Sequence, residues 1–435
     1  MRDNEFSLKG LISRNAVTLM FVVLCIVCFS FSGYTIPYLL SELVGRLSRN
    51  AFIVLALIIP IIAGMGINFA ITIGAMAAQI AILWVLEWRI PGIQGFIVAA
   101  LLTLPIATLF GYLVGKLLNQ MKGQEMIGSM ILGYFANGIY QLLFLFIFGN
   151  LVPMHAPNLV IKGATGIANT LDLKPTQLMY ALDGVWRLNF SKADEFAIAI
   201  YVLAGLALVL AILNLIRKYG SKVKSILVML VAIAACVALQ LPQVKEWLGP
   251  WCANVFSLTS VPMGTFIIVA LLCLFNNAIM RTKLGQNFRA VGQNGTVANA
   301  SGINVNRTRL IAIIFSTVLA GWGQLIFVQN MGSLQTYGAH EQVGLYAGAA
   351  ILVGGASIVR ATNAQALLGC LLFHMLFIVA PPAGKNVFGD AAIGEYFRVF
   401  ISYGVIALAL VMHAWGSSQK KKPQNAIKDA GPKTA

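Results

Sequence analysis

Residues 92–118 read GIQGFIVAALLTLPIATLFGYLVGKLL, and the single charged side chain in this run is Lys116, near its end. A helix needs about 20 predominantly apolar residues to cross the hydrocarbon core of a bilayer, so this stretch is long enough to span a membrane. Similar apolar runs continue along the chain from residue 16 to residue 415. The sequence therefore predicts an all-α, polytopic membrane bundle.

The composition of the chain supports this prediction. Of its 435 residues, 59% are apolar and 10% are charged, whereas soluble domains carry about a quarter charged residues. This excludes a cytosolic enzyme and a disordered protein. The net charge of +16 comes from short basic clusters between apolar runs, which is the pattern of cytoplasmic loops rather than of a nucleic-acid-binding surface.

The apolar runs predict about 10–12 transmembrane helices, some of them short or broken. The twelve candidate spans cover approximately residues 16–40, 51–66, 67–87, 92–118, 126–149, 196–215, 223–241, 261–280, 310–331, 343–358, 363–382 and 394–415. Glycines crowd the second, third and tenth spans. Such segments indicate either broken or re-entrant helices around a translocation path or close helix packing through small residues, and the sequence leaves both open.

The distribution of basic residues predicts the topology. If the chain starts inside and alternates, two thirds of the Lys and Arg residues fall in inside segments, as the positive-inside rule requires. We therefore expect a cytoplasmic N-terminus (1–15), a transmembrane domain (16–415) and a cytoplasmic disordered tail (416–435). Within the domain, 150–195 is predicted as an external loop and 281–309 as a cytoplasmic loop of short helices separated by turns.

The sequence offers no catalytic or metal-binding constellation. The histidines, His155, His340, His374 and His413, lack the spacing of metal ligands and are interpreted as packed or interfacial residues. Apart from His374, the centres of the predicted spans contain no ionisable residue. Because proton-coupled carriers usually need a titratable group at that depth, a proton-driven mechanism is disfavoured. The chain is interpreted as a transporter, with no cofactor of its own.

Neutral amides and hydroxyls supply the polar groups of the spans. The spacing places Asn68 and Thr72 one helical turn apart, with Gln79 two turns further on, and gives Asn137 and Gln141 a shared face. Gln324 lies in the ninth span. Each amide alone could simply form a hydrogen bond between helices. Together they predict a path for a neutral polar solute, because an amide offers both a donor and an acceptor.

Several motifs resemble the ribose-type permeases of bacterial ABC importers, a family that includes permeases for other sugars, nucleosides and branched-chain amino acids. Residues 64–74, GMGINFAITIG, resemble its G-G-I-D-L-S-V-G segment. Residues 284–305, LGQNFRAVGQNGTVANASGINV, are similar to its G-R-x-x-x-A-x-G-x-N-x-x-A-A-x-x-S-G-I-x-V loop, and residues 349–357, AAILVGGAS, to its A-x-V-x-G-G-x-S motif. The resemblance covers most of 51–149 and 261–415.

The chain departs from the family pattern at three places. Asn68 stands where the family has an aspartate, which favours a neutral ligand. Arg360 and Ala361 replace a second glycine pair, and residues 150–260 resemble an insertion of two spans and an outer loop.

The resemblance implies partners. A permease of this family pairs with a second permease subunit, two ATPase domains that bind ATP and Mg, and an external solute-binding protein, in a bacterial cell membrane. The 281–309 loop would then couple to the ATPase, and its candidate residues are Gly285, Arg289, Gly292, Asn294, Ala300, Gly302 and Asn304. The implied function is import of a neutral sugar or nucleoside.

Two alternatives remain open at this stage. The chain could be an ion-coupled secondary transporter or facilitator that acts without partners. The 281–309 loop could also be basic only because it lies inside.

Overall fold

The computed structural model describes residues 16–121, 123–157, 159–161, 166–216, 222–390, 392–400, 403–404 and 407. The predicted N-terminal segment (1–15), the tail (416–435) and much of the predicted span 394–415 lie outside these residues. The chain divides into two compact units. The first comprises 1–33, 46–182 and 267–435, and the second 34–45 and 183–266.

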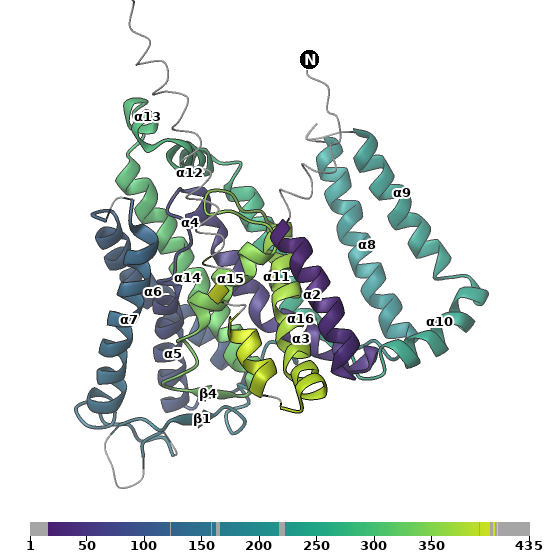
Figure 1. The fold of residues 1–435 in the computed structure, drawn as a ribbon, viewed down its shortest axis with the longest axis horizontal. Helices are drawn as coiled ribbons and strands as arrows, with labels where there is room; N and C mark the ends of the chain where they lie inside the picture. Colours follow the sequence, from purple (N-terminus) through teal and green to yellow (C-terminus); the bar gives the residue numbers. More distant parts are fainter. Residues whose placement is uncertain are drawn as a thin grey trace, which may run out of the picture. The chain divides into compact units, whose positions relative to one another are not determined.

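The first unit is a helical bundle (Figure 1). Its helices are α2 (Ala16–Ser32), most of α3 (Ile36–Ala56), α4 (Ile58–Ile62), α5 (Ile71–Glu87), α6 (Gly92–Leu118), α7 (Glu125–Leu142), the π-turn η1 (Leu143–Ile147), most of α11 (Met263–Ile279), α12 (Lys283–Gln293), α13 (Gly295–Ala300), α14 (Val305–Met331), α15 (Val343–Val353) and α16 (Asn363–Phe388). Helix α14 packs against α5 and α6, and α16 packs against α2 and α15. Strands β1 (Thr170–Asp172) and β4 (Ser333–Gln335) pair antiparallel. Figure 1 shows this pair at one end of the unit and α12 and α13 at the other.

The second unit is smaller and takes most of its residues from the stretch predicted as an insertion. Helix α8 (Ala193–Ile216) packs against α9 (Lys222–Ala238), and α10 (Pro242–Val255) bends away from α9 by 86°. Strands β2 (Arg187–Asn189) and β3 (Ser260–Pro262) pair antiparallel. Buried Leu188, Ala199, Val261 and Met263 form a small core beside this pair.

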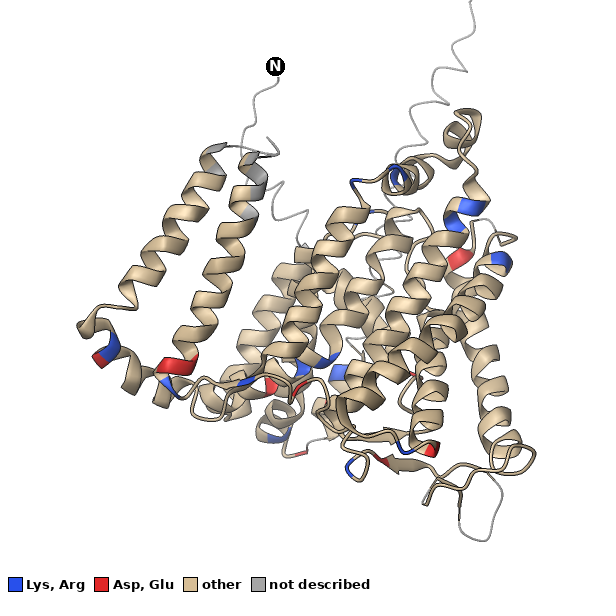
Figure 2. Cartoon of the chain, turned by 180° about the vertical axis from the view of Figure 1, so that it is seen from behind, with Lys and Arg blue, Asp and Glu red and all other residues tan. Residues whose placement is uncertain are grey.

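The predicted fold class is confirmed, because the described chain is mostly helical and rich in apolar helices. Among the described residues, five helices are long and apolar enough to cross a membrane, or up to seven if each of two bent pairs is one span, and three shorter apolar helices accompany them. Figure 2 shows most of the charged residues toward the ends of the helices.

The first predicted span, 16–40, is wrong in its boundaries. The structure breaks it after Ser32, at Gly33 with φ +70°, and starts a new helix at Ile36. Helix α3 then continues through residues 41–50, so Glu42, Arg46 and Arg49 belong to a helix rather than to a loop. Hydropathy alone missed this helix because charged residues on one of its faces interrupt the apolar run.

The glycine-rich segments combine both predicted roles. Gly64 and Gly66 have φ of +76° and +68° in the break between α4 and α5, a conformation that glycine adopts without strain. Gly74 instead allows close packing, because a Cβ there would lie 2.2 Å from the carbonyl oxygen of Thr317 on α14. Gly354 does the same between α15 and α16, where a Cβ would lie 1.8 Å from the carbonyl oxygen of Gln365.

Candidate functional site

A cavity of about 220 Å³ opens between α5, α7 and the segment that leads into α15. Thr72, Asn137, His340 and Glu341 supply polar groups to its lining, and the aromatic ring of Tyr134 also lines it. We call it the amide cavity. Its mixture of hydroxyl, amide, imidazole and carboxylate groups with an aromatic ring suits a neutral solute that both donates and accepts hydrogen bonds.

A buried hydrogen-bond network supports this cavity. The Nδ1 of His340 lies 3.0 Å from Oε1 of Gln79, and its Nε2 lies 2.8 Å from Oδ1 of Asn137. The Nδ2 of Asn137 donates to Oε1 of Glu341 at 3.3 Å. Both Gln79 and His340 are fully buried.

The network defines the proton position on His340. A neutral imidazole donates from one nitrogen and accepts at the other. Asn137 already uses its NH2 group toward Glu341, so its Oδ1 accepts from Nε2–H of His340. Within the described residues, Nε2 of Gln79 has no other partner. Rotation of the Gln79 amide therefore lets this NH2 group donate to Nδ1, and both ring nitrogens of His340 then have a hydrogen-bond partner.

Burial lowers the pKa of His340 from 6.5 to about 4, so the imidazole is neutral at pH 7. Above pH 6.5 the folded and unfolded states both hold it neutral, and the free energy of unfolding does not change through this group. As the pH falls from 6.5 toward 4, only the unfolded state binds the proton, so stability is lost by up to about 1.4 kcal/mol per pH unit.

We therefore expect the thermal unfolding midpoint of the chain in detergent to decrease as the pH is lowered from 7 to 5, because the unfolded state binds a proton at His340 and the folded state does not. The variant His340→Gln should remove this part of the pH dependence while keeping donor and acceptor groups in place. The comparison of the two chains at each pH cancels the contributions of the other titrating groups. Parallel pH profiles for the two proteins would contradict the assignment.

The structure brings together most of the predicted path residues. Gln324 reaches the same segment from α14, since its Nε2 donates to the carbonyl oxygen of Ala339 at 3.2 Å. Thr72 and Asn137 line the amide cavity directly, and Gln79 joins it through His340. Gln141 is half-buried and does not line it, so the predicted shared role with Asn137 finds no support in this cavity.

The predicted helical pairing of Asn68 with Thr72 is wrong. Helix α5 begins at Ile71, so Asn68 lies in the break that precedes it. There Oδ1 of Asn68 accepts a hydrogen bond from the backbone N–H of Ala70 at 3.1 Å, and Nδ2 contacts Oγ of Ser316 on α14 at 3.5 Å. Gly64 and Gly66, both with positive φ, precede Asn68 and interrupt the helix that the i, i+4 spacing assumed.

Sequence reasoning missed His340 and Glu341 as members of the site. His340 was interpreted as a packed histidine, which its burial confirms, but its partners could not be named. They lie 261 and 203 residues away in the sequence. A single sequence carries no signal for such a contact.

The loop 281–309 forms two short helices, α12 and α13, as predicted. Asparagine side chains begin the helices that follow them: Oδ1 of Asn294 accepts from the N–H groups of Thr296 and Val297 at 3.0 and 3.1 Å, and Oδ1 of Asn304 accepts from Arg307 N–H at 2.9 Å. These are N-caps. The two asparagines, predicted as contacts to an ATPase, therefore use their carbonyl oxygens within the chain.

The other residues singled out in this loop are two glycines packed against backbone and three exposed residues. At Gly285 and Gly292 a Cβ would lie 2.2 Å from the carbonyl oxygen of Ile279 and 2.1 Å from that of Ile62. Arg289, Ala300 and Gly302 are exposed. Gly302 has φ +81° and no neighbour within 4 Å of a Cβ position. The exposed group forms the surface available to a partner.

Helix α12 touches the break that leads to the amide cavity. The Cα of Gly292 lies 2.6 Å from the position of a Cβ on Gly64, so the two backbones are in close contact. The break continues through Asn68 to Phe69, whose N–H donates to Oγ of Ser129 on α7 at 3.0 Å and whose side chain lines the cavity. A short backbone path therefore connects α12 with the amide cavity.

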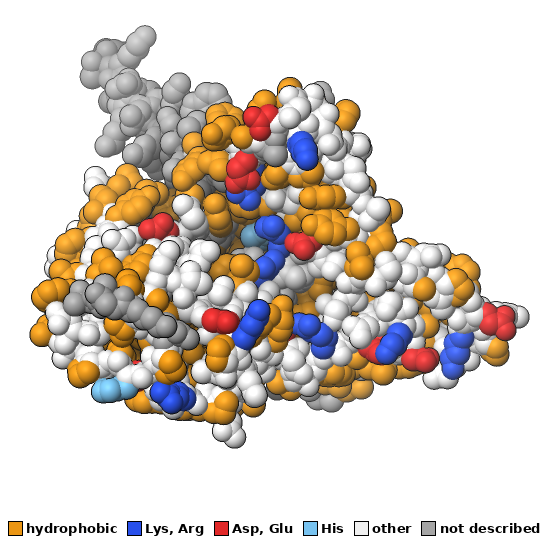
Figure 3. All heavy atoms as spheres, turned by 90° about the horizontal axis from the view of Figure 1, so that it is seen from below, with side chains coloured by type: hydrophobic (Ala, Val, Ile, Leu, Met, Phe, Trp, Pro, Cys, Tyr) orange, Lys and Arg blue, Asp and Glu red, His pale blue; other side chains and the backbone are white. Residues whose placement is uncertain are grey.

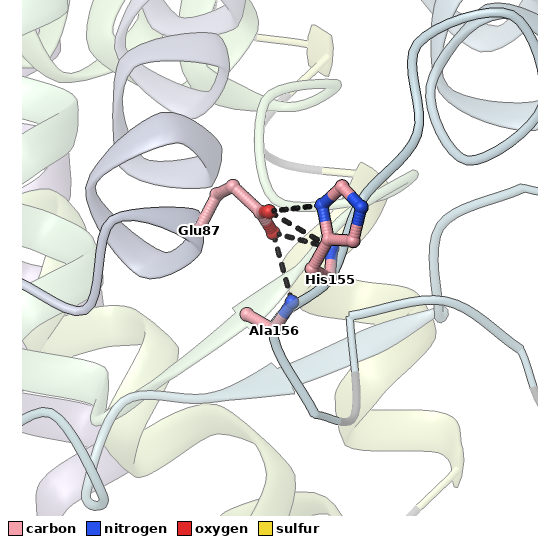
Figure 4. A network of polar contacts seen from close by, with 3 residues as sticks. All are labelled: Glu87, His155 and Ala156. Atoms are coloured by element: carbon pink, nitrogen blue, oxygen red, sulfur yellow. Dashed lines mark hydrogen bonds and ion pairs between the residues drawn. The ribbon is translucent and has the colours of Figure 1, made fainter.

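A second polar contact holds the other end of α5. Figure 4 shows Glu87, its last residue, facing the loop at His155 and Ala156. The carboxylate accepts hydrogen bonds from the backbone N–H of His155 at 2.8 Å and of Ala156 at 3.0 Å, and lies 3.3 Å from Nδ1 of His155. This contact fixes the loop after η1 to α5 and leaves the imidazole of His155 exposed.

Known transport proteins share parts of this sequence. The chain is 28% identical over 179 residues to the nucleoside ABC transporter permease protein NupC of Lactococcus lactis, and these residues make up 39% of this chain and 54% of that protein. It is 30% identical over 134 residues to the ribose import permease protein RbsC of Escherichia coli, and these residues make up 30% of this chain and 39% of that protein. It is also 30% identical over 136 residues to the probable ABC transporter permease protein YphD of Escherichia coli, and these residues make up 31% of this chain and 39% of that protein.

The matched stretch thus spans between 39% and 54% of the length of these relatives. No solved structure matches the chain significantly. The family described as the branched-chain amino acid transport system permease component matches residues 157–411, which is more than half of the chain and includes α12–α16. By this match and by its apolar helices, the chain belongs to that family of multi-pass ABC transporter permeases.

Proposed function

We propose that this protein is the permease subunit of an ATP-driven importer for a neutral sugar or nucleoside, located in a bacterial cell membrane. The observation that carries the proposal is the contact of α12, through Gly292, with the break that leads to the amide cavity. An ATPase that moves α12 would change the position of Phe69 and of the start of α5. In this way ATP-driven closure of the ATPase domains would favour one of the two states in which the cavity is open to one side of the membrane.

The amide cavity supports the neutral substrate. Asn137 and Thr72 offer hydrogen bonds beside the uncharged His340, and Tyr134 offers an aromatic surface. The relatives include a nucleoside and a ribose permease. We propose as partners an ATPase pair that binds ATP and Mg, a second permease subunit and an external solute-binding protein.

The exposed surface of α13 and the turn after it is the proposed ATPase contact. We expect an ATPase to co-purify with the tagged chain from its native membrane in mild detergent, and to be lost from the variant Gly302→Arg. This variant places a long cation on the exposed turn, where the structure has room for it, although a positive φ disfavours a side chain there by about 1 kcal/mol.

The matched control is Gly295→Ala, at the start of α13, where a Cβ would have no neighbour closer than 3.8 Å. It should retain the ATPase. Equal retention by Gly302→Arg would remove the turn from the proposed contact. If the unmodified chain retains no ATPase but alone carries a solute down an ion or solute gradient in proteoliposomes, the import proposal is wrong.

A further inference from the structure

A second cavity of about 360 Å³ lies between α3, the end of α14, α15 and α16. Arg46, Arg49 and Arg398 line it together with His374. The described residues that line it include no carboxylate. We call it the arginine cavity. Figure 3, seen from the β1–β4 end, shows Lys and Arg side chains beside a histidine in the middle of this face, with acidic side chains close by.

Two segments carry the guanidinium groups that line the cavity. Arg46 and Arg49 are three residues apart on α3 and so share one face of the helix. Arg398 comes from the helical residues 392–400, and its guanidinium carbon lies 4.3 Å from the centre of the Phe377 ring on α16. Arg398 also forms an ion pair with Glu395. The ring and the ion pair hold the third guanidinium in position.

His374 gives an independent indication of a ligand. Its side chain is only 5% exposed, and it lines the arginine cavity. Within the described residues, its Nδ1 has no hydrogen-bond partner. Buried polar side-chain atoms in folded proteins nearly always have a partner, so this nitrogen is suited to a hydrogen bond with a group bound in the cavity.

A contact of Arg49 also indicates a ligand in the arginine cavity. Its Nη1 lies 2.9 Å from Sδ of Met331, and a thioether is a weak acceptor for a guanidinium donor. A stronger acceptor inside the cavity would compete well for this N–H group. Guanidinium groups match the planar oxygens of phosphate and carboxylate, to which they donate paired hydrogen bonds.

We propose that the arginine cavity binds a small solute through an oxyanion, and that a phosphate monoester is the group that fits it best. A dianion bound in the cavity would be attracted by all three guanidinium groups that line it. The inference does not depend on the proposed import function, because it concerns binding to this chain alone. Uptake and ATPase binding are not needed for its test.

The test measures the thermal unfolding of the purified full chain in nonionic detergent and chloride buffer. We expect inorganic phosphate and ribose 5-phosphate to raise the unfolding midpoint in a saturable way, and any stabilisation by ribose, which lacks the oxyanion, to be unaffected by Arg49→Gln. The variants Arg49→Gln and Arg398→Gln should each weaken phosphate binding about tenfold, the value of one charge-assisted hydrogen bond of about 1.5 kcal/mol. Two variants are used so that poor folding of one does not decide the result.

Arg360→Gln is the matched control, because it removes an exposed arginine away from the cavity. It should bind phosphate as the unmodified chain does. A short-chain phosphatidic acid is tested in parallel to identify the source of the phosphate group. If the lipid stabilises the chain but ribose 5-phosphate does not, and Arg49→Gln loses the effect of the lipid, the site is supported and its ligand is a lipid headgroup. Absence of stabilisation by all three phosphates, or equal binding by Arg49→Gln and Arg360→Gln, overturns the proposal.

Discussion

Gly292→Val is expected to reduce ATP-driven uptake about a hundredfold per inserted molecule. A Cβ at this position would lie 2.1 Å from the carbonyl oxygen of Ile62 and 3.0 Å from the backbone nitrogen of Gly64. These are backbone atoms and cannot rotate away as a side chain would. Valine therefore pushes α12 off the break, at a cost of up to about 3 kcal/mol, which corresponds to about a hundredfold change in an equilibrium.

The measurement is uptake divided by the amount of inserted protein, with ATPase retention determined in the same membranes. We expect retention to persist, because the exposed surface of α13 and Gly302 is unchanged. Gly295→Ala, only three positions along the chain, adds a methyl group with no neighbour closer than 3.8 Å and should transport normally. Normal uptake per molecule by Gly292→Val would show that the contact between α12 and the break does not transmit the ATPase signal.

The sequence was sufficient for the features that depend on local composition. Apolar runs predicted the helical membrane bundle, and the ordered motif of 284–305 predicted short helices that the structure shows as α12 and α13. Glycine clusters marked both the break after α4 and the close crossings at Gly74 and Gly354. In each case the physical cause, hydrophobicity or backbone freedom, is a property of the residues themselves.

Features that depend on distant contacts were not accessible in the same way. His340 joins Gln79 and Asn137 from far along the chain, and Arg398 meets Phe377 of a different helix. Arg46 and Arg49 were placed between spans because a window of mean hydropathy averages over the faces of a helix. The two asparagines of the loop were given a partner role although local backbone N–H groups use their oxygens.

Asn68→Leu is expected to reduce uptake about thirtyfold while leaving ATPase retention unchanged. Asn68 is 2% exposed, and its Oδ1 accepts from the N–H of Ala70 while its Nδ2 contacts Ser316. Leucine would leave the N–H of Ala70 buried without this acceptor, at a cost of about 2 kcal/mol. That cost falls on the break between α12 and the amide cavity, and about 2 kcal/mol corresponds to about thirtyfold.

Asn68→Asp is the matched control because a carboxylate keeps the acceptor for Ala70 N–H and can accept a hydrogen bond from the Ser316 hydroxyl. It should retain most of the uptake. Combining Asn68→Leu with Ser316→Ala should add little to the loss, since the two residues share one contact. If Asn68→Leu lowers uptake and ATPase retention equally, Asn68 stabilises the fold as a whole, and the break is not the element that carries motion from α12 to the amide cavity.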